Sequence, residues 1–190
     1  IFHLAAQPLV RYSYKNPKET FDTNFNGTLN ILECVKNIKT IKTTVIITSD
    51  KVYDVNKSKI FKENDLLGGI DPYSASKVCI EHLFFSYKKS FFDKNNKQKL
   101  ATVRAGNVIG GGDYSEDRLI PDIYKFKKKR KKIILRNPRA IRPWQHVLEP
   151  LSGYLLLAQN LNSKKIRNTF HSWNFGPNLS NCKSVLYIAL

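Results

Sequence analysis

The chain has 190 residues, 42% of them apolar and 12% aromatic, and it carries a formal net charge of +17. The apolar and aromatic content predicts a globular protein with a sizeable core rather than a disordered chain. No stretch approaches the roughly 20 apolar residues that span a bilayer, so we expect no membrane partner.

The three cysteines are too far apart to form a C-x-x-C pair, and they are Cys34, Cys79 and Cys182. This spacing predicts neither a metal site nor a redox site. Because the first residues also lack the basic start of a secretory signal, we expect a reduced, cytoplasmic compartment.

Short apolar runs alternate along the chain with longer segments whose apolar residues recur at spacings of three and four. The short runs are typical of buried parallel strands, which we expect at residues 1–5, 44–48, 100–104 and 172–175. The longer segments are typical of amphipathic helices, which we expect at residues 20–38, 72–92 and 147–161. The alternation predicts the α/β class, with a partial doubly wound parallel sheet of the Rossmann-like type.

Residues 110–145 interrupt this alternation with three consecutive glycines and five arginines. We interpret them as an excursion that covers the site, where guanidinium groups suit a diphosphate because they donate paired hydrogen bonds to its oxygens. For any single arginine, a surface salt bridge is the simpler explanation. The glycines lack the G-x-G-x-x-G spacing of a phosphate-binding loop, which favours a flexible turn.

A basic run occupies residues 125–132, where every residue except Phe126 is lysine or arginine. It could bind a polyanion such as nucleic acid. Only Phe126 interrupts the run, and the lack of aromatic residues interleaved along it favours the solvated end of a surface helix instead. We therefore expect no nucleic-acid partner.

Two short motifs carry groups capable of acid–base chemistry. Ser49, Asp50 and Lys51 follow the predicted strand 44–48, and Tyr73 and Lys77 stand four apart in the predicted helix 72–92. Residues four apart share one face of a helix, so the ammonium can lie beside the phenol and lower its pKa from ~10. The phenolate would then serve as a base near neutral pH. For Asp50 and Lys51, a salt bridge at a strand end is the alternative.

The order of these motifs is more specific than either motif alone. Tyr73-x-x-x-Lys77 follows Thr48-Ser49-Asp50-Lys51, and further matching blocks lie at residues 3–11, 68–77, 103–122, 136–158 and 173–177. Over nearly its whole length the chain resembles the extended short-chain dehydrogenase/reductases that act on nucleotide sugars. The resemblance implies NAD as the cofactor, a nucleoside-diphosphate sugar as the substrate, and a homodimer or higher homo-oligomer when the protein is intact.

Within this family the chain is most similar to the 4,6-dehydratases, which are hydro-lyases. The resemblance implies oxidation of a glucosyl C4, elimination of water across C5 and C6, and reduction of C6, giving a 4-keto-6-deoxy sugar. Tyr73 would take the proton of the 4-hydroxyl with Lys77 beside it, and Ser49 would hydrogen-bond to the 4-oxygen.

The resemblance gives Asp50 and Lys51 the two roles in the elimination. Asp50 would protonate the departing 6-hydroxyl, so it must be a carboxylic acid when the substrate is bound. Lys51 would remove the C5 proton, which requires a neutral amine. Because the relatives that act on dTDP-glucose carry Glu at this position, Lys51 favours the branch that acts on CDP-sugars.

The same resemblance implies the other site residues and the domains. The cofactor-binding residues would be Ala5, Ala6, Gln7, Asn24, Thr48, Tyr73, Lys77 and Arg104. The substrate-binding residues would be Asn107, Arg118 and Arg142. Residues 1–109 and 146–178 would form the C-terminal part of an NAD-binding domain, and residues 110–145 and 179–190 a partial, smaller substrate-binding lobe.

One departure from the family is the absence of its glycine-rich turn, which seats the cofactor pyrophosphate on a helix N-terminus. We therefore expect this chain to be a fragment that lacks both ends of the protein and binds NAD poorly by itself. The alternatives are a dTDP-glucose 4,6-dehydratase, a 4-epimerase, which would not need Asp50 and Lys51, and a polyanion-binding fragment without catalytic activity.

Overall fold

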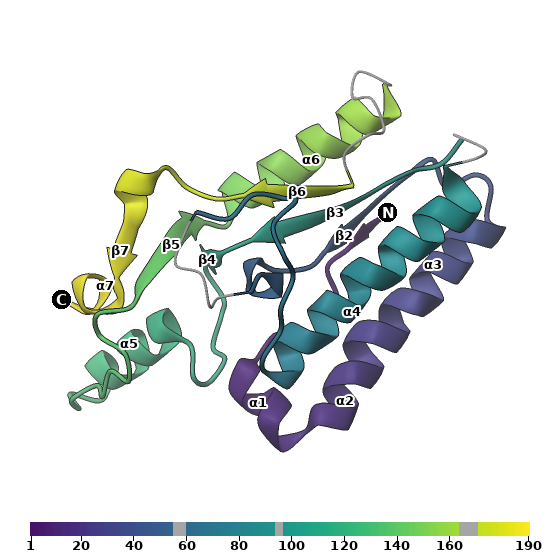
Figure 1. Ribbon diagram of the computed structural model, residues 1–190. Helices are drawn as coiled ribbons and strands as arrows, with labels where there is room; N and C mark the ends of the chain where they lie inside the picture. Colours follow the sequence, from purple (N-terminus) through teal and green to yellow (C-terminus); the bar gives the residue numbers. More distant parts are fainter. Residues whose placement is uncertain (55–59, 94–96, 164–170) are drawn as a thin grey trace. The chain divides into compact units, whose positions relative to one another are not determined.

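The computed structural model describes residues 1–54, 60–93, 97–163 and 171–190 (Figure 1). It divides into two compact units, Ile1–Ala105 with Ser152–Phe175 and Gly106–Leu151 with Gly176–Leu190. The domains predicted from the sequence have different boundaries and concern the intact protein, so they stay a prediction. Among the described helices, none is long and apolar enough to cross a membrane.

The first unit is built on a parallel sheet of four strands in the order β1-β2-β3-β6. The strands are β1 (Phe2–His3), β2 (Thr43–Ile47), β3 (Lys99–Ala105) and β6 (Ser172–Phe175). Val45 and Ala101 are register partners at the centre of the sheet, and both are fully buried. The predicted α/β class with a partial, Rossmann-like parallel sheet is confirmed.

Helices cover both faces of this sheet. Helices α3 (Gly27–Asn37) and α4 (Pro72–Tyr87) lie side by side on one face, and α6 (Leu148–Asn162) lies on the other (Figure 1). Seven side chains form the core under α3 and α4, namely Leu32, Val35, Ile46, Ile80, Phe84, Phe92 and Leu100. On the α6 face, the rings of Tyr154 and Phe175 meet edge to face, 5.2 Å between their centroids.

The predicted helix 20–38 is interrupted in the structure. Short helices α1 (Val10–Lys15) and α2 (Pro17–Phe21) come first, and a π-helical turn, Asp22–Asn26, separates α2 from α3. The predicted helix 72–92 likewise ends in a π-helical turn, Lys88–Phe92. Helix α6 and three of the strands agree with their predicted bounds to within one residue, whereas β1 is shorter than expected.

The second unit has a small mixed sheet that the sequence did not predict. Strand β5 (Ile141–His146) pairs in parallel with β4 (Asn107–Ile109) and antiparallel with β7 (Cys182–Ser184). Helices α5 (Leu119–Lys128) and α7 (Val185–Ala189) complete the unit. The indole Nε1 of Trp144 donates a hydrogen bond to the carbonyl of Lys183, 2.9 Å away, which ties β5 to β7.

A close backbone approach at Gly68 holds the segment that follows β2. Gly68 N donates to the carbonyl of Val52 at 2.8 Å, and a Cβ added at Gly68 would lie 2.8 Å from the Cα of Asp54. Gly68→Ala should therefore destabilise the intact protein by about 1–3 kcal/mol in urea unfolding. Gly27→Ala is the control, because it meets nothing within 4 Å in a helix and should be neutral or stabilising. Equal unfolding midpoints for the two variants would contradict this packing argument.

Candidate active site

The first group of side chains lies where β2 ends. Thr48 continues the sheet by donating its N–H to the carbonyl of Val103 at 2.8 Å, and a 3₁₀ turn, Asp50–Val52, follows Ser49. The Ser49 hydroxyl caps this turn, since its Oγ accepts a hydrogen bond from Lys51 N at 3.2 Å. The turn therefore presents Ser49, Asp50 and Lys51 at the carboxyl end of a parallel strand, where ligands of α/β proteins bind.

Asp50 and Lys51 form an ion pair, with 3.7 Å between the Asp50 Oδ1 and the Lys51 Nζ. The two side chains are 35% and 41% exposed, respectively. An exposed pair of this kind contributes about 0–1 kcal/mol, so a ligand can separate it at little cost. The salt bridge weighed in the sequence analysis is thus present, and it does not prevent either group from acting on a ligand.

The second group lies on the first two turns of α4. Asp71 caps this helix by accepting from Ser74 N at 2.9 Å, and Pro72 occupies its first turn. Tyr73 and Lys77 are both buried, 7% and 4% exposed. Helix α4 packs against the 3₁₀ turn 50–52, so the structure brings the two groups of predicted catalytic residues to neighbouring elements.

The charged end of the Lys77 side chain lies at the carboxyl end of β2. Its Nζ donates to the carbonyl of Ile47, the last residue of β2, at 3.1 Å. Burial lowers the pKa of Lys77 to about 8, and the charge of the Glu81 carboxylate opposes that shift. Among the described residues Ile47 is the one hydrogen-bond partner of Nζ, which leaves two N–H groups for a ligand.

Asn24 ties the residues after β1 to α4. It lies in the π-helical turn 22–26, and its Oδ1 accepts from Gln7 N at 2.8 Å. Its Nδ2 donates to the Gln7 carbonyl at 3.1 Å and to the Ser76 Oγ at 2.9 Å. The Asn24 side chain therefore shapes the segment carrying Ala5, Ala6 and Gln7, and direct contact with a cofactor stays a prediction.

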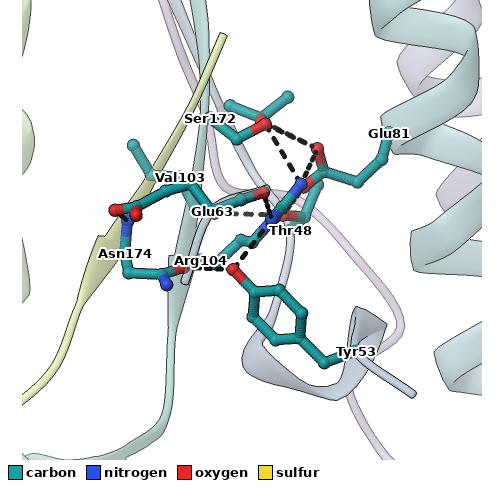
Figure 2. A network of polar contacts seen from close by, with 9 residues as sticks. Thr48, Tyr53, Glu63, Glu81, Val103, Arg104, Ser172 and Asn174 are labelled. Atoms are coloured by element: carbon teal, nitrogen blue, oxygen red, sulfur yellow. Dashed lines mark hydrogen bonds and ion pairs between the residues drawn. The ribbon is translucent and has the colours of Figure 1, made fainter. Parts of the chain in front are cut away.

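Arg104 and Thr48 belong to a buried polar network around Glu81 (Figure 2). The Arg104 guanidinium makes five hydrogen bonds within the protein, two of them to Glu81. Since a guanidinium has five N–H groups, none remains for a cofactor in this arrangement. The cofactor contacts of Arg104 and Thr48 therefore stay a prediction. In this structure both side chains donate hydrogen bonds to the Glu81 carboxylate.

Glu81 is the residue of this site that the sequence analysis missed. The charge of Arg104 and its hydrogen bonds keep the pKa of the Glu81 carboxyl below its ordinary value, although burial alone would raise it. The available signal was an acidic residue directly after Ile80 and three residues before Phe84, two apolar positions of the helix. A buried carboxylate there requires a cation, and that cation is 23 residues away in the sequence.

The predicted substrate-binding residues all lie in the second unit. The buried Oδ1 of Asn107 on β4 has no hydrogen-bond partner, which fits a ligand donor. Arg118 precedes α5 and pairs with Asp113 at 3.2 Å, and Arg142 is exposed on β5. No contact among these three residues is present in the described chain, so their shared role stays a prediction.

The described residues contain no group of three or more His, Cys, Asp or Glu side chains that could hold a metal ion.

A parallel Rossmann-like sheet that bears a serine at the end of a central strand and a Tyr-x-x-x-Lys helix beside it is typical of short-chain dehydrogenase/reductases.

Comparison with known proteins gives the family. A model described as GDP-mannose 4,6 dehydratase matches residues 1–186, and the chain belongs to this family. The predicted family is thus confirmed.

Individual relatives agree with this assignment. The chain is 50% identical over 194 residues to CDP-glucose 4,6-dehydratase of Salmonella typhimurium, covering 99% of this chain and 54% of that protein. It is 34% identical over 143 residues to the dTDP-D-glucose 4,6-dehydratase of Dictyostelium discoideum, covering 70% of this chain and 31% of that protein. The chain therefore spans about half of the Salmonella protein and less of the other.

A solved structure shows the same fold. It is the dTDP-glucose 4,6-dehydratase of Bacillus anthracis in complex with NAD, with a TM-score of 0.78 at 26% identity. The match covers 100% of this chain and 54% of that chain.

Proposed function

We propose that the intact protein converts CDP-glucose to its 4-keto-6-deoxy sugar, as a hydro-lyase that uses bound NAD. The observation that carries this proposal is that two pairs of side chains lie on neighbouring elements, α4 and the turn 50–52. Tyr73 and Lys77 suit the removal of a hydroxyl proton, whereas Asp50 and Lys51 suit the elimination of water. The 50% identity to the Salmonella CDP-glucose 4,6-dehydratase supports this substrate.

The residues present fit one part of the cofactor. The two remaining N–H groups of the buried Lys77 suit the hydroxyls of a ribose, and the small side chains of Ala5 and Ala6 allow close approach to the backbone. NAD supplies hydride transfer, away from C4 and back to C6, so that no net oxidation results. The glycine-rich turn that binds the pyrophosphate in this fold is not among these 190 residues, so they account for only part of a cofactor site.

Each proposed catalytic side chain transfers one proton or stabilises one charge. Tyr73 takes the proton of the 4-hydroxyl while the Lys77 ammonium stabilises the phenolate, and Ser49 donates a hydrogen bond to the 4-oxygen. The C4 ketone that results makes the C5 proton acidic. Lys51 then removes that proton, and Asp50 delivers a proton to the departing 6-hydroxyl.

The ion pair of Asp50 and Lys51 already holds the number of protons that the elimination needs. Moving one proton from the ammonium to the carboxylate gives the neutral amine and the carboxylic acid together. Exclusion of water by a bound sugar favours this neutral pair, because desolvation penalises charged groups. After elimination the amine has gained a proton and the acid has lost one, so the ion pair is restored.

The partners and the location of the intact protein follow from the same proposal. Its substrate is a nucleoside-diphosphate sugar, and we expect a homodimer or higher homo-oligomer. The 50% exposed Phe85 and the 44% exposed Phe91, on α4 and the turn after it, support pairing with a second copy. The free cysteines agree with a reduced, cytoplasmic compartment.

Product analysis tests the reaction directly. The intact protein is incubated with NAD and with CDP-, dTDP-, UDP- or GDP-glucose, and the masses of the products are measured by mass spectrometry. We expect the loss of one water, fastest from CDP-glucose. An isomer of unchanged mass would indicate a 4-epimerase and refute the proposal, and a preference for dTDP-glucose would refute the substrate.

The basic residues of the run 125–132 are all exposed, at the end of α5 and beyond it. If they only solvate that helix end, replacing Lys127, Lys128 and Lys131 by glutamine should leave turnover within about threefold of the wild type. Steady-state kinetics measure this effect. A binding assay with RNA or DNA at two salt concentrations is the control, since a strongly salt-dependent affinity lost in the variant would show a polyanion site.

A further inference from the structure

The Glu81 carboxylate joins α4 to three strands of the sheet. It is 3% exposed and accepts hydrogen bonds from Thr48 after β2, Thr102 on β3 and Ser172 on β6. Arg104 on β3 adds two parallel bonds of 2.9 Å to the same carboxylate (Figure 2). A single side chain therefore links α4 to three neighbouring strands, in addition to the apolar contacts of Ile80 and Phe84.

Arg104 extends the connection to the segment that carries the 3₁₀ turn. Its Nη1 donates to the Tyr53 hydroxyl at 2.8 Å and to the Glu63 carbonyl at 3.0 Å. Tyr53 directly follows the turn 50–52, and its hydroxyl donates to Asn174 on β6 at 2.7 Å. Figure 2 shows this ring below the guanidinium, with its hydroxyl pointing into the network.

Glu81 lies four residues after Lys77 and eight after Tyr73, on the same face of α4. The network thus reaches the proposed Tyr–Lys pair through the helix and the proposed Asp–Lys pair through Tyr53. We infer that Glu81 and Arg104 are positioning residues that hold these two catalytic pairs in register with each other. This inference rests on the proposed function, since it assigns how that site is aligned.

The network also acts on Lys77 through charge. In the described chain, the Glu81 carboxylate and the His3 imidazole on β1 interact electrostatically with Lys77, and Ile47 on β2 offers a carbonyl. The Tyr73 phenol lies one turn earlier on α4. Of the ionisable groups among these, the Glu81 carboxylate is the one that favours the ammonium form of Lys77. Glu81→Gln removes that charge, and Arg104→Ala retains it.

The two substitutions should therefore differ in their pH profiles. Without the carboxylate, the ammonium of Lys77 is lost at a lower pH. We expect Glu81→Gln to move the alkaline limb of the pH profile of turnover to lower pH, and Arg104→Ala not to move it to lower pH. Both variants should lower kcat at least about tenfold and change KM for the sugar less than about threefold, because neither residue contacts it.

A cavity of about 420 Å³ borders the network, lined by Glu81, Arg104 and Ser172 among other residues. It gives a small cation access to the space that Arg104→Ala would leave. Added guanidinium ion, at concentrations too low to unfold the protein, should therefore restore turnover of Arg104→Ala several-fold. It should not restore Glu81→Gln, which lacks the anion that binds it.

The experiment uses the intact protein with NAD and first establishes the reaction of the wild type. If the wild type does not eliminate water, the proposed function is refuted. The inference is tested separately, by the kinetics of the variants and by urea unfolding of each variant without ligands. Glu33→Gln is the matched control, because Glu33 pairs with Lys36 at 2.6 Å and accepts from the Tyr87 hydroxyl on α4 at 2.7 Å. Glutamine keeps an acceptor oxygen for Tyr87, so turnover and its pH profile should stay as in the wild type.

Opposite results would overturn the inference. Equal pH profiles for Glu81→Gln and Arg104→Ala, or a rise in KM with unchanged kcat, would show a role in folding or in sugar binding instead. If Glu81→Gln does not fold, the guanidinium experiment decides, since failure to restore turnover of a folded Arg104→Ala contradicts a positioning role. Restoration supports it.

Discussion

Asp50→Asn should lower the rate of water loss from CDP-glucose by about 10²- to 10⁴-fold, the usual contribution of a general acid. Asparagine keeps the shape of the side chain but cannot deliver a proton to the departing 6-hydroxyl. Oxidation at C4 uses Tyr73 and Lys77 and should persist. Rapid mixing of the variant with substrate should therefore show reduced cofactor that accumulates by absorbance, with no loss of water by mass spectrometry.

Lys51→Gln is the companion variant for this experiment. It should also stop the elimination, but it should prevent exchange of the C5 proton with deuterated solvent as well, because the proposed base is gone. If Asp50→Asn dehydrates at the wild-type rate, Asp50 is not the acid, and the ion pair of 3.7 Å is only a surface salt bridge.

Lys77→Met should lower turnover by about 10²- to 10⁴-fold and at the same time stabilise the protein without ligands. The pKa of Lys77 lies at about 8 in the fold and at 10.5 ordinarily, so the folded chain binds fewer protons between these pH values. The stability of the wild type must then rise with pH across this window. Below pH 8 the full penalty applies, which is about 3 kcal/mol for a shift of this size.

Urea unfolding from pH 7 to pH 10 measures the effect. Lys77→Met should be more stable than the wild type at pH 7, and the difference should shrink as the pH rises. Lys88→Met is the control, because Lys88 is 1% exposed but pairs with Asp93 at 2.6 Å, and its loss should bring no gain. A constant difference between Lys77→Met and the wild type at every pH would contradict the burial argument.

The features that could be predicted from the sequence are those with local signals. The central strands appear as runs such as residues 44–48, and Tyr73 and Lys77 share a helix face by spacing alone. The sheet of β4, β5 and β7 has no such run, since β5 contains Arg142 and Pro143 and the other two strands have three residues each. The link between Glu81 and Arg104 was not predictable, because only the fold brings α4 onto β3.

Because of the π-helical turn 22–26, a deletion in this part of the chain should disturb the structure more than a substitution does. A π-helical turn holds one residue more than the α-helical ladder needs. Deleting that residue would let α2 and α3 join as one continuous helix, but it would rotate everything before the turn by roughly 100° relative to α3. Thr20, which accepts a hydrogen bond from Gln7, would then face another direction. Substitutions on the exposed side of these helices can accumulate, whereas a single in-frame deletion would separate the segment after β1 from α4.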